Sequence, residues 1–152
     1  LTLRNTGTTP MPAGLGFHPY FPCTGQTLLR FDASGAYPPM GNGPLAIQAL
    51  DATNSFTTLR PVSGTGLDHC YAGWHGPATI IQPETGLQVS VTPLRGARHC
   101  VVYTPVDKPY FCLEPVSHLT GAFEAPDPAA AGLELLHPGA ALDLAISIEA
   151  RR

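Results

Sequence analysis

Glu114 is the ionisable residue with the most unusual setting for its type. It ends the apolar run Tyr110-Phe111-Cys112-Leu113 and is followed directly by Pro115. A glutamate in such a setting is seldom without a partner or a task. Loss of hydration raises the pKa of a carboxyl toward the range that suits a general base. The pattern is also compatible with a buried structural glutamate that is hydrogen-bonded to the backbone.

His18 lies in a second segment that mixes an ionisable group with aromatic residues, Gly14-Leu15-Gly16-Phe17-His18-Pro19-Tyr20-Phe21. The glycines and the proline predict a rigidly placed imidazole beside apolar surface. Such an imidazole can donate or accept a proton near neutral pH. A structural histidine bonded to a backbone carbonyl is the alternative.

Asp68 and Trp74 belong to a third segment, Gly66-Leu67-Asp68-His69-Cys70-Tyr71-Ala72-Gly73-Trp74. A carboxylate accepts hydrogen bonds from hydroxyl groups, and a flat aromatic ring packs on the apolar face of a pyranose. The segment therefore favours a sugar-binding site to which Asp68 and Trp74 contribute. An aspartate that caps a turn is the structural alternative for Asp68.

The composition favours a small, uncharged ligand. Charged residues make up only 12% of the chain, and the net charge is −3. Without a run of basic residues, nucleic acid is not an expected partner. The apolar runs are too short and too interrupted to span a membrane, and no signal peptide is visible. We therefore expect a cytoplasmic protein that binds a hydroxyl-rich small molecule.

Short strands must position the three segments, because 16 glycines and 17 prolines leave little room for helices. The chain opens on an apparent strand, Leu1-Thr2-Leu3. Apolar or alternating runs bounded by turn residues predict further strands at 28–31, 78–82, 87–92, 99–104, 110–114 and 141–149. Leu142, Leu144, Ile146 and Ile148 share one face of the last strand.

The only helical candidate is 129–136, and Gly132 weakens it. Many short strands joined by glycine and proline turns predict an all-β, antiparallel sandwich. We expect residues 1–152 to form a single β unit.

The four cysteines, Cys23, Cys70, Cys100 and Cys112, are widely spaced and form no C-x-x-C pair. This spacing gives little support to a disulfide framework or a metal site. It fits small buried side chains in a reducing compartment. We therefore expect neither a metal nor a cofactor.

Three strings of the sequence together resemble one enzyme family. GFHPYF, LDHCYAGW and FCLEPVSHLTGAF occur in the order and approximate spacing of the aldose 1-epimerase (galactose mutarotase) family. The stretches 4–12 and 132–139 are similar to the flanking parts of that family. The resemblance covers the whole chain but corresponds only to the C-terminal half of a family member.

The resemblance implies part of a galactose mutarotase-like supersandwich and an acid–base reaction at the anomeric carbon of aldohexoses such as galactose or glucose. Glu114 is similar to the residue that takes the proton from the C1 hydroxyl, and His18 to the residue that protonates the ring oxygen. Asp68 is similar to a carboxylate that holds sugar hydroxyls. The implied reaction interconverts the α and β anomers without a cofactor.

No segment resembles the N-terminal half, which in the family supplies an arginine and another histidine to the sugar pocket. We therefore expect an incomplete pocket, and either self-association or pairing with a missing N-terminal half. Two other functions stay open. One is a mutarotase for hexose 6-phosphates, which needs converging Arg or Lys side chains. The other is a carbohydrate-binding β-sandwich without catalysis.

Overall fold

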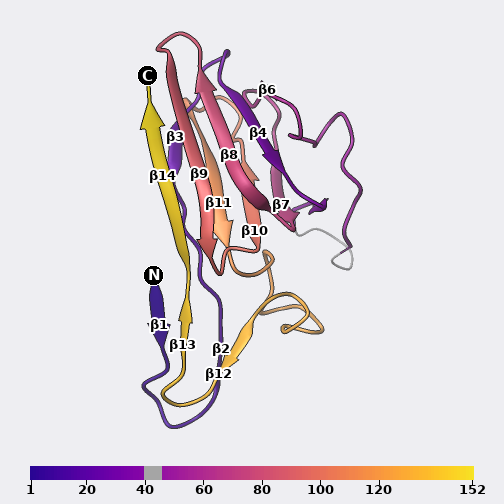
Figure 1. The fold of residues 1–152 in the computed structure, drawn as a ribbon. Coiled ribbons are helices and arrows are strands. Elements are labelled where there is room, and N and C mark those ends of the chain that lie inside the picture. The colour runs from indigo at the N-terminus through magenta and orange to yellow at the C-terminus, as the bar shows by residue number, and fades with distance from the viewer. Residues whose placement is uncertain (40–45) are drawn as a thin grey trace.

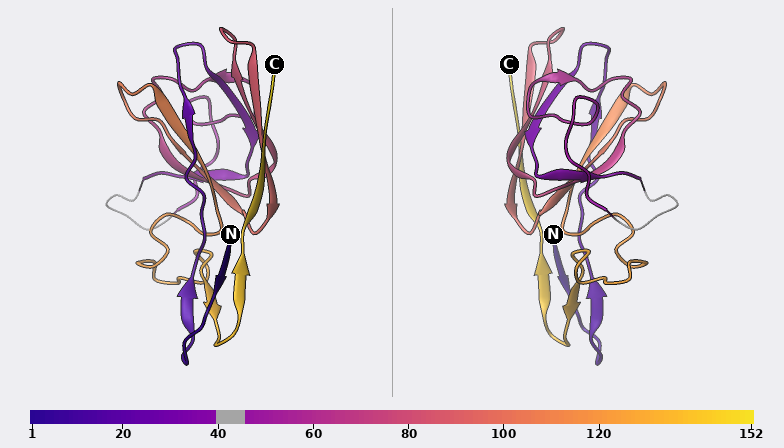
Figure 2. Two further views of the ribbon diagram at one scale, coloured as in Figure 1. Left: turned by 90° about the vertical axis from the view of Figure 1, so that its left-hand side faces the viewer. Right: turned by 90° about the vertical axis from the view of Figure 1, so that its right-hand side faces the viewer.

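The computed structural model describes residues 1–39 and 46–152, and every regular element in these two ranges is a strand. Two five-stranded antiparallel sheets form two layers, which Figure 2 shows side-on. Sheet 1 has the order β3 (Tyr20–Pro22), β11 (Tyr110–Val116), β10 (His99–Tyr103), β7 (Asp68–Ala72) and β5 (Gly35–Tyr37).

Sheet 2 has the order β14 (Ala145–Arg151), β9 (Leu87–Arg95), β8 (His75–Gln82), β4 (Leu28–Asp32) and β6 (Arg60–Pro61). Two short strand pairs extend beyond one end of the layers (Figure 1). They are β1 (Thr2–Arg4) with β13 (Ala141–Asp143), and β2 (Met11–Ala13) with β12 (Glu134–Leu136). The sequence prediction of an all-β antiparallel fold is confirmed.

Side-chain alternation along the strands builds the main core between the two sheets. Phe111 and Leu113 of β11 and Leu29 of β4 are fully buried there, and Phe31 is 1% exposed. Each such side chain stabilises the fold by about 1.5–3 kcal/mol through loss of contact with water. Because successive residues of a strand point to opposite faces, the residues between them are left for the outer faces of the layers.

The predicted strands at 28–31, 78–82, 87–92, 99–104 and 110–114 correspond to β4, β8, β9, β10 and β11. The predicted helix at 129–136 is wrong. Its first part is a turn, in which Gly132 has a φ of +94° and the N–H of Leu133 donates to the carbonyl of Pro128. Its last three residues form β12, which pairs with β2. Pro128 and the positive φ of Gly132 favour the turn over a helix.

The predicted strand at 141–149 is two strands, β13 and β14, separated at Leu144. The N–H of Leu144 donates to the carbonyl of Leu1 instead of continuing the ladder of β14. Leu144 is fully buried, whereas Ile148 is 48% exposed. The four apolar residues of this stretch therefore do not form one buried face, because the chain changes its pairing partner halfway.

All four cysteines are free; Cys70, Cys100 and Cys112 are buried and Cys23 is partly exposed. The part of the chain that the structure describes contains no helix of the length and apolarity needed to cross a membrane.

A short segment before β3 is held against the end of β11. The N–H of Phe17 donates to the carbonyl of Pro115, and Leu15 exchanges hydrogen bonds with the backbone and hydroxyl of Ser117. Gly14 and Gly16 make this close approach possible. A Cβ on Gly14 would lie under 3.0 Å from three ring atoms of His118, and one on Gly16 would lie 2.9 Å from a methyl group of Val116.

We expect Gly14→Ala to destabilise the protein by about 1–3 kcal/mol, because the added methyl group overlaps the ring of His118 and must displace it. Urea unfolding followed by circular dichroism measures the change. Gly25→Ala is the matched control, since a Cβ there meets nothing within 4 Å. Equal unfolding midpoints for the two variants would show that the segment tolerates displacement.

Two histidines lie half-buried where β10 begins and β11 ends. Burial lowers the pKa of His118, and burial together with Arg98 and His118 lowers that of His99. As the pH falls, these histidines take up protons near the ordinary pKa of 6.5 in the unfolded chain, but only at a lower pH in the folded chain. Their contribution to stability is therefore present above about pH 6.5 and lost as the pH falls below it.

We expect these two histidines to lower the free energy of unfolding between pH 7 and pH 5, so that in His118→Gln it falls less than in the unmodified protein. Denaturant titrations at several pH values measure the slope. His137 is exposed, so His137→Gln should keep the slope of the unmodified protein. A slope unchanged by His118→Gln would mean that protonation of His118 does not oppose folding.

Candidate functional site

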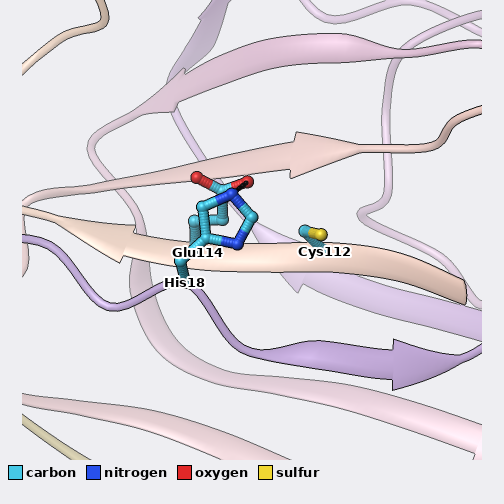
Figure 3. A group of neighbouring side chains, drawn as sticks. All are labelled: His18, Cys112 and Glu114. Carbon is cyan, nitrogen blue, oxygen red and sulfur yellow. Dashed lines mark ion pairs between the residues drawn. The ribbon is translucent and has the colours of Figure 1, made fainter.

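The carboxylate of Glu114 and the imidazole of His18 meet on the face of sheet 1 that points away from the main core. Glu114 Oε1 lies 3.2 Å from His18 Nε2, and Figure 3 shows the imidazole lying against the Glu114 side chain. The Glu114 side chain is 14% exposed and that of His18 is 54% exposed. The pair therefore joins a largely buried carboxylate to an imidazole that solvent reaches. We call this outer face of sheet 1 the site face.

Burial raises the pKa of Glu114, and the charge of Asp68 raises it further, while His18 lowers it. The first cause is the largest, so the carboxyl titrates above its ordinary range. This is the direction that the apolar run before Glu114 predicts. A carboxylate with a raised pKa is a better proton acceptor than an ordinary one.

Aromatic rings fix the orientation of His18. Its ring stacks on Tyr20, with centroids 4.9 Å apart and an angle of 26° between the planes. Tyr20 in turn contacts Tyr110 edge to face, with centroids 5.2 Å apart. The backbone bonds of Phe17 and the stack on Tyr20 together hold the imidazole over β11.

Asp68 lies on the site face, two strands away from Glu114. Glu114 is opposite Val101 of β10, which is opposite Cys70 of β7, so these three side chains share a face. Asp68 precedes Cys70 by two residues and points the same way. It is exposed, and its charge acts on Glu114. The structure thus brings His18, Glu114 and Asp68 to one face.

Trp74 does not join them. Its side chain is 3% exposed and belongs to the main core between the sheets. Its indole N–H has no hydrogen-bond partner within the described ranges. The geometry therefore gives no support to a contact between a sugar on the site face and Trp74.

Sequence reasoning missed four other side chains of the site face: Tyr20, Tyr103, Tyr110 and Cys112. Cys112 is opposite both Tyr20 and Tyr103 across the strands, and Tyr110 precedes it by two residues on β11. Because side chains on one face of a strand recur every second residue, the sequence positions of Cys112 and Tyr110 relative to Glu114 could have identified them. Tyr103 needed the register between β10 and β11, which no local pattern reveals.

Cys112 adds a thiol to the acid–base pair. Its sulfur, the imidazole nitrogen of His18 and a carboxylate oxygen of Glu114 all lie within 4.8 Å of one another. Burial, followed by the charge of Glu114, raises the pKa of the thiol to about 11. It therefore stays protonated near neutral pH and is a poor nucleophile there. The arrangement is suited to paired proton transfer, and its three donors could also coordinate a metal.

Comparisons with known proteins agree on one family. The sequence profile of the family Aldose 1-epimerase matches residues 1–149. The uncharacterised protein YphB of Escherichia coli K12 is 33% identical over 137 residues, which are 84% of this chain and 47% of that protein.

Solved structures show the same fold. A candidate aldose 1-epimerase of Escherichia coli K12 superposes with a TM-score of 0.85 at 27% identity, over 99% of this chain and 54% of that one. The galactose mutarotase-like protein of Clostridium acetobutylicum has a TM-score of 0.71 at 13% identity, over 99% and 51% of the two chains. The chain spans about half the length of these relatives. By its sequence and its fold, this chain belongs to the aldose 1-epimerase family.

Proposed function

We propose that the protein is a mutarotase that interconverts the α and β anomers of free aldohexoses such as galactose or glucose. Membership of the aldose 1-epimerase family supports an isomerase. The observation that carries the proposal is the contact of 3.2 Å between His18 and Glu114 on the site face. The C1 hydroxyl and the ring oxygen of a pyranose share one carbon atom, so an acid and a base a few ångströms apart can serve both.

The proton transfers balance within this pair. Glu114, as the carboxylate, takes the proton of the C1 hydroxyl while protonated His18 gives a proton to the ring oxygen. The bond between C1 and the ring oxygen breaks, and the open aldehyde forms. Rotation about the bond between C1 and C2 exposes the other face of the carbonyl, and the reverse transfers close the ring and restore both groups. Each positioned proton transfer contributes about 10²–10⁴-fold in rate.

The charges near the pair favour a neutral sugar over a phosphorylated one. Asp68 and Glu114 are the charged side chains that share the site face with His18. Three of the arginines form ion pairs with carboxylates elsewhere: Arg30 with Asp32, Arg95 with Asp143, and Arg98 with Glu134. Phosphate recognition needs converging cationic donors. The described residues around the pair supply none.

The acid–base pair also favours catalysis over simple sugar binding. Binding needs hydrogen bonds and apolar contact, and Asp68 with the exposed Tyr20 and Tyr103 could provide both. It does not need a carboxyl with a raised pKa held against an imidazole. Perturbed titratable groups of this kind are more typical of catalytic sites.

We further propose that the pocket is completed by protein outside these 152 residues, through a second copy or through the portion that longer relatives contain. His18 and Tyr20 are 54% and 62% exposed, so water competes with a sugar at the site face. Covering that face would exclude water and strengthen each hydrogen bond to the sugar.

We expect Glu114→Gln to lower turnover by about 10²–10⁴-fold while the KM for the sugar changes little, because the amide keeps the shape but cannot accept the proton. Polarimetry of freshly dissolved α-D-glucose and α-D-galactose with the complete protein measures the rate. Glu149 is exposed on β14 of the other sheet, and Glu149→Gln is the matched control. Turnover that survives Glu114→Gln would remove Glu114 from the role of base.

We expect Asp68→Asn to weaken sugar binding with a much smaller effect on turnover. A hydrogen bond to a charged group is worth about 1 kcal/mol more than a neutral one, so KM should rise roughly five- to tenfold. The same polarimetric assay, run over a range of sugar concentrations, separates KM from turnover. Asp107→Asn, at an exposed carboxylate beyond the site, is the control. A pure turnover defect would contradict the role proposed for Asp68.

A further inference from the structure

Cys112 is the group of the site that the proposed reaction does not use. It lies two residues before Glu114 on β11, so both side chains point to the site face. Figure 3 shows the ring of His18 with Glu114 on one side and Cys112 further along the same strand. Donor atoms of the three side chains lie within 4.8 Å of one another. A thiol, an imidazole and a carboxylate thus surround one point.

The spacing is close to that of a tetrahedral metal site. Zinc binds cysteine sulfur at about 2.3 Å and histidine nitrogen and carboxylate oxygen at about 2.0–2.2 Å, so tetrahedral ligand atoms stand roughly 3.3–3.6 Å apart. The separation of 3.2 Å between His18 Nε2 and Glu114 Oε1 is close to the lower end of this range. The sulfur of Cys112 lies at most 4.8 Å from each of the other two donor atoms, so these two separations must shorten by no more than about 1 Å. Metal binding therefore requires small side-chain rotations within the three ligands.

We propose that His18, Cys112 and Glu114 bind a divalent transition metal of the Zn²⁺ and Co²⁺ class. Thiolate and imidazole ligands select such ions over Mg²⁺ and Ca²⁺, which prefer oxygen ligands alone. On binding, the thiol releases its proton to solvent and forms the bond between sulfur and metal. One thiolate and one carboxylate then balance the two positive charges of the ion. Three protein ligands leave the fourth position of the tetrahedron to water.

The surroundings hold the histidine ligand in advance. The stack on Tyr20 orients the His18 ring, and the hydrogen bond from Phe17 to Pro115 fixes the backbone beside it. Outer partners of this kind raise metal affinity by orienting the ligands. His18 is 54% exposed, so an ion can approach the buried sulfur of Cys112 from the side of the imidazole.

A bound ion would occupy the lone pairs of the proposed acid and base. The metal is therefore an inhibitor that competes with the sugar, and this consequence rests on the proposed function. The metal binding itself does not, because it depends only on the three donors. Cys112 thereby makes the proposed reaction sensitive to inhibition by transition metals.

Titration of the reduced, tag-free complete protein with Co²⁺ tests the site. We expect absorption from sulfur-to-cobalt charge transfer that saturates at one ion per chain and disappears in Cys112→Ser. Cys23→Ser is the matched control, because Cys23 is partly exposed and lies outside the site, and it should keep the full signal. Circular dichroism of each variant checks that it is folded.

Two further variants test the site if the Cys112→Ser protein does not fold. His18 is exposed, so His18→Gln should leave the fold intact, and we expect it to weaken cobalt binding by at least about tenfold, since even outer partners of metal ligands are worth about 10–100-fold. Glu114→Gln should weaken binding in the same direction. Competition by Zn²⁺ should remove the cobalt signal.

The site is refuted if excess Co²⁺ gives no charge-transfer absorption, if the absorption persists in Cys112→Ser, or if His18→Gln binds as tightly as the unmodified protein. These readouts are independent of catalysis. A protein that binds cobalt but does not interconvert anomers would overturn only the proposed function. One that interconverts anomers without binding cobalt would overturn only the metal site.

Discussion

The register of β11 between β3 and β10 is the constraint on which the site depends. Phe111 and Leu113 point into the core and are fully buried, and this fixes which face Cys112 and Glu114 occupy. A shift of one residue would expose the two apolar side chains and bury the carboxylate, because the side-chain period of a strand is two. Burial of the core thus orients the chemistry on the opposite face.

The segment before β3 supplies the second half of the site through contact with the same strand. Residues 15–17 bond to residues 115–117, so the loop that carries His18 follows the path of β11. The close approach at Gly14 and Gly16 sets the height of the imidazole above the sheet. His18 and Glu114, the proposed acid and base, are therefore placed by one strand and its immediate neighbour. Among the more distant parts of the sheet, Asp68 on β7 acts on the pair through its charge, which raises the pKa of Glu114.

Local patterns predicted those elements whose cause is local. The strands at 28–31, 87–92 and 110–114 follow from alternation or apolar runs between turn residues, and the structure contains them. The helix at 129–136 was wrong for two reasons: Pro128 and the positive φ of Gly132 favour a turn, and the last three residues pair with a strand far away in the sequence. The unbroken strand at 141–149 was wrong because its outcome depends on a distant contact. β12 needs β2 as a partner, and Leu144 turns aside to pair with Leu1. Neither partner is visible within a window of ten residues.

The site residues also divide into those that local sequence indicates and those that only the three-dimensional structure reveals. His18, Asp68 and Glu114 stand out in sequence because each is an ionisable group placed among aromatic residues, and the structure brings them to one face. Trp74 has an equally suggestive neighbourhood, yet its large apolar surface is buried in the core. Cys112 looks like an ordinary buried cysteine until the strand period places it beside Glu114. A thiol at that point takes no part in the proposed proton transfer, but it completes the three ligands of the proposed metal site. The alternation of β11 with the core therefore sets what this strand contributes to the site face, and a change at position 112 should alter the proposed metal binding without replacing the proposed acid or base.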